Sequence, residues 1–305
     1  MSISFEGQVA IVTGAGNGLG RSHALALAER GAKVVVNDLG GARDGSGASS
    51  AAADEVVALI QANGGEAFAH GANVANFDEV QDMVKQTMDK WGRVDVLINN
   101  AGILRDKTFA KMDLADFKLV MDVHVMGSVN CTKAVWDIMR EQNYGRILMT
   151  TSSSGLYGNF GQSNYGAAKM AVIGFMNTLV IEGHKHDIRV NALAPTAATR
   201  MTEDLMPQEI LDMLKPEAVT AGALALCHKD SPNKFILAAG AGGYAKAGIF
   251  ETDGIFISED EQSTDVINAA LPKISETEGM QELQSGSKQG EKFLGKAMAF
   301  VNAQK

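Results

Sequence analysis

Short apolar runs rich in β-branched residues alternate along most of this chain with segments of helical apolar spacing. This alternation constrains the fold more than any other feature, because neither kind of segment can bury its apolar face alone. Seven runs are expected to be strands, namely residues 8–13, 33–37, 66–71, 94–99, 146–151, 189–194 and 235–239. The expected helices are residues 22–30, 51–63, 78–91, 115–142, 167–185 and 217–228.

Strands that are joined by crossover helices pair in parallel, and right-handed crossovers place helices on both faces of the sheet. The sequence therefore predicts an α/β fold of the Rossmann type, a doubly wound seven-stranded parallel sheet with a C-terminal extension. The extension begins near Ser258, which forms a capping box with Glu261 before a helical segment. We expect residues 1–257 to form the Rossmann domain and residues 258–305 to pack on it or on a neighbouring subunit. A disordered linker over residues 274–292 is the alternative.

Composition excludes several classes of function. The formal net charge of −9 argues against nucleic-acid binding, which needs clustered Lys and Arg. No basic amphipathic stretch and no window of about 20 apolar residues is present, so no membrane association is expected. Cys131 and Cys227 lie far apart, which predicts no metal site and a reducing compartment. With neither a secretory leader nor the peroxisomal ending Ser-Lys-Leu, a cytoplasmic protein is expected.

A glycine-rich turn, Thr-Gly-Ala-Gly-Asn-Gly-Leu-Gly at residues 13–20, follows the first expected strand and opens the first expected helix. Glycines let the backbone approach a pyrophosphate closely, and the free N–H groups of a helix start favour an anion. Such a turn alone is weak evidence, because structural turns of this kind are common. Between a strand and a helix it predicts a dinucleotide site that includes Gly14, Asn17, Gly18, Leu19 and Gly20.

Asp38 ends the second expected strand. A carboxylate there accepts hydrogen bonds from the adenosine ribose hydroxyls and repels a 2′-phosphate, which favours NAD over NADP. The next residue, Leu39, is not basic, in agreement with NAD as the cofactor. Arg43 in the following glycine-rich loop is the reservation, because it could swing toward a phosphate. The alternative for Asp38 is an acid that caps the turn at Gly40 and Gly41.

Three further motifs follow in order: Asn-Asn-Ala-Gly at residues 99–102, Ser152, and Tyr165 with Lys169 four residues later. Together with the glycine turn, they resemble the short-chain dehydrogenase/reductase family over residues 5 to about 245. Any one of these motifs arises by chance, whereas four in this order are highly specific. The resemblance implies an NAD-dependent oxidoreductase that acts on CH–OH donors, with Ser152, Tyr165 and Lys169 as its catalytic core.

The chemistry follows from these residue types. A phenol with a pKa near 10 is too weakly ionised to act as a base at neutral pH. A nearby Lys169 ammonium and an oxidised nicotinamide would lower the pKa of Tyr165 by about two to three units. Lys169 shares a helix face with Tyr165, and in the family this lysine also binds the nicotinamide ribose. Ser152 would donate a hydrogen bond to the substrate oxygen.

The resemblance carries over to other positions as well. It implies further cofactor contacts from Asn73, Val74, Asn99, Ala101, Gly102, Pro195, Thr196 and Thr199. It also shows one departure, because His124 stands where family members usually have an asparagine that holds a water in a proton relay. An imidazole can donate, accept and titrate near neutrality, so we expect His124 to replace it in the relay. The alternative is a helix histidine with a structural role.

Residues 37–41, 155–169 and 200–217 resemble one branch of the family more closely. That branch is the (3R)-hydroxyacyl-CoA dehydrogenase domain of peroxisomal multifunctional enzyme type 2, also described as a type 4 17β-hydroxysteroid dehydrogenase. The resemblance implies oxidation of (3R)-3-hydroxyacyl-CoA to 3-ketoacyl-CoA, a step of fatty acid metabolism, by a homodimer or homotetramer. The alternatives are a dehydrogenase of a steroid or another small secondary alcohol, and a non-catalytic dinucleotide-binding protein.

The residues themselves support only part of this substrate assignment. An apolar segment after the sixth expected strand suits an acyl chain or a steroid equally, and includes Met201, Leu205, Met206, Ile210, Met213 and Leu214. An ordinary amphipathic helix is the alternative. A coenzyme A ester also needs cations for its phosphates. The candidates are Arg105, Lys107, Lys111, Arg200 and Lys215, although a solvated charged surface explains any one of them.

Overall fold

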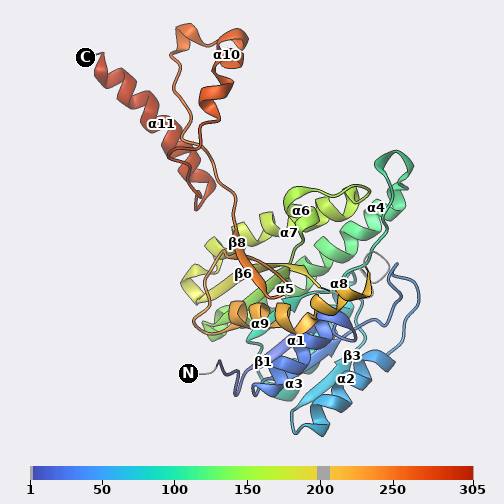
Figure 1. The fold of residues 1–305 in the computed structure, drawn as a ribbon. Coiled ribbons are helices and arrows are strands. Elements are labelled where there is room, and N and C mark those ends of the chain that lie inside the picture. The colour runs from blue at the N-terminus through green and yellow to red at the C-terminus, as the bar shows by residue number, and fades with distance from the viewer. Residues whose placement is uncertain (1–2, 198–206, 305) are drawn as a thin grey trace. The chain divides into compact units, whose positions relative to one another are not determined.

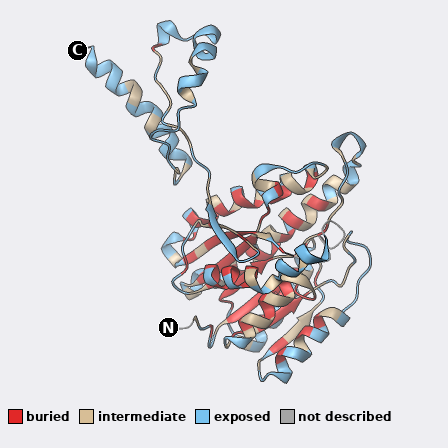
Figure 2. Ribbon diagram, viewed as in Figure 1, coloured by how far each residue is buried: buried red, intermediate tan, exposed pale blue. Residues whose placement is uncertain are grey.

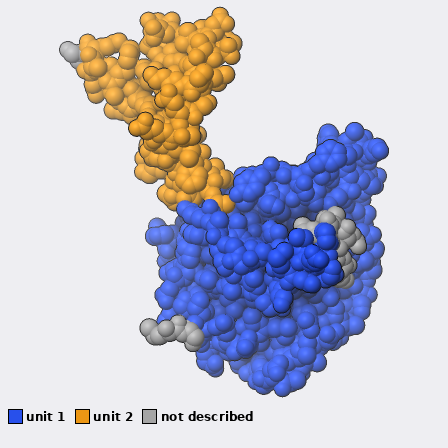
Figure 3. Space-filling model, in the orientation of Figure 1, with its two compact units in different colours: residues 1–246 blue, residues 247–305 orange. Residues whose placement is uncertain are grey.

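The computed structural model describes residues 3–197 and 207–304. The chain forms two compact units, Met1–Lys246 and Ala247–Lys305 (Figure 3). The expected domain boundary after residue 257 lies further along the chain than this division. The expected packing of the extension stays a prediction.

Unit 1 is built on a sheet of eight strands in the order β3-β2-β1-β4-β5-β6-β7-β8 (Figure 1). The strands are β1 Val9–Thr13, β2 Lys33–Asn37, β3 Ala67–His70, β4 Val96–Asn99, β5 Gly145–Thr150, β6 Ile188–Thr196, β7 Ile236–Gly240 and β8 Gly243–Ala247. All neighbours from β3 to β7 pair in parallel. Chain order reverses direction at β1, whose neighbours are β2 and β4. These pairings confirm the doubly wound α/β fold.

Helices cover both faces of this sheet (Figure 1). The helices of unit 1 are α1 Gly18–Glu29, α2 Ala51–Ala62, α3 Phe77–Trp91, α4 Leu114–Met121, α5 Gly127–Gln142, α6 Ser153–Tyr157, α7 Ser163–Glu182, α8 Gln208–Met213 and α9 Pro216–Cys227. Helix α1 packs against α2 and α9, while α5 packs against α3, and α4 against α7. The central strands are almost wholly buried between these layers (Figure 2), which explains their continuous apolar sequences.

The eighth strand was not among the seven expected. Strand β8 follows β7 after Ala241 and Gly242, whose φ angles are +48° and +77°. Two residues with positive φ make the tight turn that joins antiparallel strands. The sequence of β8 is Gly-Tyr-Ala-Lys-Ala, and its residues are mostly exposed. Because it contains no apolar run, the sequence pattern did not predict this strand.

The long helix expected over residues 115–142 is interrupted. Between α4 and α5 the backbone forms a π-helical turn, Asp122–Met126. A π turn inserts one extra residue into a helix, and the apolar residues on either side of this one predict a single continuous helix. Such turns are rare and frequently occur at functional sites. His124 lies within this one.

Unit 2 contains α10 Thr264–Ile274 and α11 Gly286–Ala303. The expected capping pair is present, since Ser258 Oγ donates to Glu261 Oε2 at 3.0 Å. It spans a short 3₁₀ turn, however, and α10 starts later with Ser263 as its N-cap. Among residues 3–197 and 207–304, no helix combines the length and apolar character that a membrane span requires.

Candidate active site

The carboxyl ends of the parallel strands bring the sequence motifs to one edge of the sheet. The glycine turn lies there between β1 and α1, in direct contact with the segment after β4. A Cβ on Gly14 would lie 2.8 Å from Ala101 Cα, and one on Gly20 would lie 2.1 Å from the Gly14 carbonyl oxygen. Glycine is therefore required at both positions by close backbone packing.

Asn100, which the sequence reasoning did not single out, holds this turn. Its Nδ2 donates to the carbonyl oxygens of Thr13 at 2.9 Å and Gly14 at 3.0 Å. In return, Thr13 Oγ1 accepts from the backbone N–H groups of Asn100 and Ala101, both at 3.0 Å. The Asn-Asn-Ala-Gly motif contained this signal, but only its other members were assigned to the cofactor.

The start of α1 is open to an anion. Asn17 is the N-cap with an extended backbone, its side chain makes no capping bond, and the first turn has no acidic residue. The first backbone N–H groups of the helix therefore lack side-chain acceptors and point toward the edge of the sheet. Gly18 begins this helix, and Leu19 packs on the core next to it.

Asp38 lies beside the glycine turn, as expected. Its Oδ2 accepts from the Gly16 N–H and its Oδ1 from the Gly40 N–H, both at 2.7 Å. The two interpretations of Asp38 are therefore compatible, since it caps the turn at Gly40 and also faces the glycine turn. Each oxygen keeps acceptor capacity for a ribose hydroxyl.

The expected adenine contacts lie on the loop after β3. Val74 is buried against α5, where a Cβ on Gly127 would meet its Cγ2 at 2.6 Å. Asn130 Nδ2 donates to the Val74 carbonyl oxygen at 2.9 Å. Asn73 uses Oδ1 locally, accepting from the Ala75 N–H at 3.0 Å. These bonds fix the backbone of the loop at the edge of the sheet.

Ser152, Tyr165 and Lys169 come together after β5. Ser152 is the N-cap of α6, and its Oγ accepts from the Ser154 N–H at 3.2 Å. Tyr165 and Lys169 lie one turn apart on α7, with Lys169 Nζ 5.5 Å from the centroid of the Tyr165 ring. Nζ also donates to the Thr150 carbonyl oxygen at 2.7 Å. A hydrogen bond with Ser152 links the Tyr165 hydroxyl to the same cluster.

Burial sets the titration of this cluster. It raises the pKa of Tyr165 to about 12, although the hydrogen bond with Ser152 opposes the rise. Burial also lowers the pKa of Lys169 to about 7. The expected fall in the pKa of Tyr165 depends on a bound nicotinamide as well as on Lys169, so it stays a prediction for the loaded enzyme. Desolvation of the phenolate outweighs the single hydrogen bond with Ser152.

His124 is buried beside this cluster. Its Nε2 lies 3.1 Å from the backbone nitrogen of Ile103 and 2.8 Å from its carbonyl oxygen. Burial, and then the charge of Lys169, hold the pKa of His124 well below its usual value. A Cβ on Gly102 would lie 2.3 Å from His124 Cε1, so glycine is needed where the imidazole packs.

Within the described ranges 3–197 and 207–304, three buried polar atoms at this edge have no hydrogen-bond partner. They are Asn99 Oδ1, His124 Nδ1 and Thr150 Oγ1. A buried polar atom without a partner costs free energy, so such atoms mark a place for a polar ligand or an ordered water. Together with the open start of α1 and the position of Asp38, they fit a nicotinamide dinucleotide.

The remaining candidates divide into three groups. Pro195 and Thr196 end β6, and a Cβ on Gly240 would lie 2.8 Å from Thr196 Cβ. In the apolar segment Leu214 is buried, whereas Ile210 and Met213 are exposed. Thr199, Arg200, Met201, Leu205 and Met206 lie outside the described residues.

Two of the cations proposed for coenzyme A are engaged in ion pairs. Arg105 Nη1 lies 2.8 Å from Asp116 Oδ1, and Lys107 Nζ lies 3.4 Å from Asp116 Oδ2. Lys111 is exposed, and Lys215 is the N-cap residue of α9. The ion pairs neutralise part of the positive charge that a phosphate would need.

A doubly wound sheet with a dinucleotide turn and a Ser-Tyr-Lys cluster at its carboxyl edge defines a nicotinamide-dependent oxidoreductase. The chain belongs to the short-chain dehydrogenase family, because the profile of that family, described as short chain dehydrogenase, matches residues 8–210. It is therefore an enzyme of the dehydrogenase/reductase type with a nicotinamide dinucleotide cofactor.

Similar proteins agree with this assignment. Peroxisomal multifunctional enzyme type 2 of Mus musculus is 49% identical over 264 residues, which are 85% of this chain and 35% of that protein. The structure of the full-length enzyme of the same name from Drosophila melanogaster matches with a TM-score of 0.81 and 36% identity, covering 96% of this chain and 49% of that one. A 7α-hydroxysteroid dehydrogenase complexed with NADH and 7-oxo glycochenodeoxycholic acid matches with a TM-score of 0.70 and 30% identity, covering 79% of this chain and 95% of that one. This chain thus spans about a third of the mouse protein.

Proposed function

We propose that this enzyme oxidises (3R)-3-hydroxyacyl-CoA to 3-ketoacyl-CoA with NAD as the acceptor. The observation that carries the proposal is the convergence of Ser152, Tyr165 and Lys169 beside a dinucleotide turn. The similarity to peroxisomal multifunctional enzyme type 2 supports the substrate class.

Each group has a defined task in the reaction. The glycine turn and Asp38 would hold the cofactor, whose oxidised nicotinamide would supply the hydride acceptor and a positive charge at the site. The Tyr165 oxygen takes the proton of the substrate hydroxyl, and Ser152 Oγ donates a hydrogen bond to the substrate oxygen. A charged Lys169 stabilises the phenolate. The products are a ketone, the reduced cofactor and one proton.

The proton must then leave the buried site. Lys169 Nζ uses one of its donors on Thr150, which leaves others for an ordered water. His124 Nδ1 is buried without a protein partner and belongs to the neighbouring turn. We infer a relay from Tyr165 through Lys169 and water to His124, in place of the usual asparagine. The low pKa of His124 keeps the imidazole neutral and able to accept.

The choice of NAD over NADP rests on Asp38. Its carboxylate contacts the Gly16 and Gly40 N–H groups and would face the adenosine ribose. A second negative charge on a 2′-phosphate would be repelled there.

A second candidate function is oxidation of a steroid or another small secondary alcohol. The pairing of Arg105 and Lys107 with Asp116 favours it, because these cations are then less available to the phosphates of coenzyme A. The similarity to a 7α-hydroxysteroid dehydrogenase agrees with this candidate.

A homodimer or homotetramer remains our proposal for the assembly. Exposed apolar side chains of Met170 and Ile181 on α7 support it, and a monomeric mass in solution would contradict it. The cytoplasmic location also stays a prediction, because the mouse relative is peroxisomal by name.

The test is NADH absorbance with (3R)- and (3S)-hydroxybutyryl-CoA and hydroxydecanoyl-CoA, each with NAD or NADP. Turnover of the 3R esters with NAD is expected, and Tyr165→Phe should lower it at least about a thousandfold while NADH still binds. Turnover of steroids but of no ester would support the second candidate. Full activity of Tyr165→Phe would overturn the mechanism.

A further inference from the structure

The loop that joins β2 to α2 is folded back on itself. The Ser49 N–H donates to the Leu39 carbonyl oxygen at 3.0 Å and closes the base of the loop. Within it, the Ala42 N–H donates to the Ser46 carbonyl oxygen at 2.7 Å, and Ser46 Oγ donates to Asp44 Oδ1 at 2.7 Å. We call residues 39–49 the strap. These bonds give it a defined shape although residues 44–49 are exposed.

The tip of the strap is attached to the segment after β4. The Leu104 N–H donates to the Arg43 carbonyl oxygen at 3.0 Å, and Arg105 Nε donates to the Asp44 carbonyl oxygen at 2.8 Å. Gly45 has a φ of +86°, and a Cβ on it would lie 3.2 Å from Ile103 Cγ2. The attachment thus includes two hydrogen bonds and the close packing of the Gly45 backbone beside Ile103.

Sheet topology dictates where the strap runs. In the sheet, β1 lies between β2 and β4. The strap leaves the carboxyl end of β2 and is bound to the segment that follows the carboxyl end of β4. It therefore crosses the carboxyl end of β1, where the glycine turn begins. That is the position at which a dinucleotide binds in a doubly wound sheet.

The anchor segment is held more firmly than the strap. Ile103 is buried and its backbone bonds with His124. The Arg105 carbonyl oxygen accepts from Nδ2 of Asn164, which is fully buried next to Tyr165. An exposed loop with few contacts opens at lower free energy than a buried segment. Opening of the strap should therefore cost less free energy than opening of its anchor.

We propose that residues 39–49 form a strap that closes the dinucleotide site, so that the cofactor enters and leaves only when the strap releases residues 103–105. This inference rests on dinucleotide binding at the glycine turn, as in the proposed function. The strap excludes water from the pyrophosphate of the cofactor and slows the release of the cofactor.

A reversible lock tests the proposal. In the double variant Gly45→Cys/Ile103→Cys, the Cβ atoms would be 3.8 Å apart, a normal separation for a disulfide. The native Cys131 and Cys227 are both buried and do not interfere. NADH binding is followed by stopped-flow fluorescence, with the variant oxidised before or after NADH is added.

Oxidation before NADH should slow association by about tenfold or more, and oxidation after NADH should slow dissociation likewise. Reduction should restore both rates, and the single variant Ile103→Cys should be insensitive to oxidant. Equal rates of NADH association and dissociation in the oxidised and reduced double variant would contradict the proposal that the strap closes the site. Absence of NADH binding by the unaltered enzyme would instead refute the dinucleotide site itself.

Deletion of residues 41–47 provides a second, independent test. The bond between Leu39 and Ser49 closes the loop below the deleted part, so the ends of β2 and α2 keep their positions. NADH should dissociate about tenfold faster or more, with the melting temperature of the cofactor-free protein unchanged. An unchanged dissociation rate would contradict the proposal even if the cysteine variant failed to fold.

Discussion

The imidazole ring of His124 meets the phenol ring of Tyr165 edge-on, with ring centroids 5.2 Å apart and planes at 88°. His124 belongs to the π-helical turn Asp122–Met126, and its ring contact with Tyr165 places it beside the active site. The same ring is tied to Ile103 through Nε2, while Nδ1 stays without a partner. The orientation of the imidazole is thus fixed, and its Nδ1 is available to bond with a water or a ligand.

His124→Ala should lower kcat by about 10- to 100-fold, because general acid–base assistance is worth at least that much. The dependence of kcat on pH should also shift, since the proton would leave Lys169 by another route. His124→Asn, which provides the amide usual in the family, should recover most of the activity. Steady-state rates between about pH 6 and 10 measure both effects. An unchanged kcat and an unchanged pH dependence in His124→Ala would show that His124 takes no part in a proton relay.

Asp38→Asn tests the choice of cofactor. The change removes the negative charge beside the ribose, so NAD binding should weaken about tenfold and the preference for NAD over NADP should fall. Fluorescence titration with NADH and NADPH gives both constants. Because one of the Gly16 and Gly40 N–H groups loses its acceptor, the melting temperature is recorded alongside. An unaltered ratio of the two affinities would show that Asp38 does not select the cofactor.

Much of the fold was predictable because buried parallel strands have continuous apolar sequences. The second strand was placed at its observed bounds, Lys33–Asn37. Strand β8 was missed because it is exposed and follows from a two-residue turn rather than from burial. The π turn at Asp122–Met126 was missed because apolar residues continue on both sides of it and predict one unbroken helix.

The site was predictable where a short motif carries its chemistry. The glycine turn and Asp38 lie together because β1 and β2 are neighbours in parallel. The attachment of Arg43 to Leu104 could not be predicted, since a bond between two backbone groups leaves no trace in the side chains. The pKa of Tyr165 also depends on burial, which a sequence pattern does not quantify.

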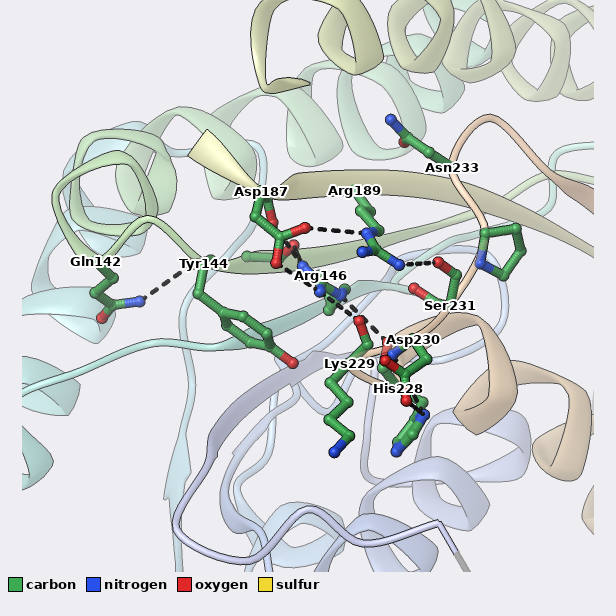
Figure 4. A network of polar contacts seen from close by, with 12 residues as sticks. Gln142, Tyr144, Arg146, Asp187, Arg189, His228, Lys229, Asp230, Ser231 and Asn233 are labelled. Atoms are coloured by element: carbon green, nitrogen blue, oxygen red, sulfur yellow. Dashed lines mark hydrogen bonds and ion pairs between the residues drawn. The ribbon is translucent and has the colours of Figure 1, made fainter. Parts of the chain in front are cut away.

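Near the amino end of the central strand β5, Arg146 holds several segments together (Figure 4). Its guanidinium is buried and lies 4.2 Å from the Tyr144 ring centroid. It donates to Asp187 Oδ2 at 2.9 Å and to the carbonyl oxygens of Gly145, Asp187, His228 and Lys229. These bonds join β5 to the start of β6 and to the loop after α9.

Arg146→Lys should destabilise the protein by about 2–4 kcal/mol. A single ammonium cannot donate to all the acceptors that surround the planar guanidinium. Arg140→Ala is the matched control, since Arg140 forms an exposed pair with Asp137 at 3.1 Å. The control should cost less than about 0.5 kcal/mol. Urea unfolding measures both changes. Equal midpoints for Arg146→Lys and the unaltered protein would show that the buried network adds nothing to stability.

His23 on α1 predicts how stability responds to acid. It is fully buried, and its Nδ1 lies 2.7 Å from Thr220 Oγ1. That hydroxyl donates to Ser22 Oγ at 2.8 Å, so the His23 Nδ1–H must be the donor and Nε2 carries no proton. Nε2 is buried without a partner, and burial lowers the pKa of His23 to about 4.

The folded protein therefore binds fewer protons at His23 than the unfolded chain between about pH 4 and 6.5. Stability from this residue is complete above pH 6.5 and is lost as pH falls toward 4, by about 3 kcal/mol in total. In His23→Gln this part of the pH dependence should disappear, whereas the exposed control His184→Gln should retain it. Urea unfolding at half-unit intervals of pH measures the slope. A steep acid loss that persists in His23→Gln would assign it to other groups and leave the buried imidazole without a role in acid unfolding.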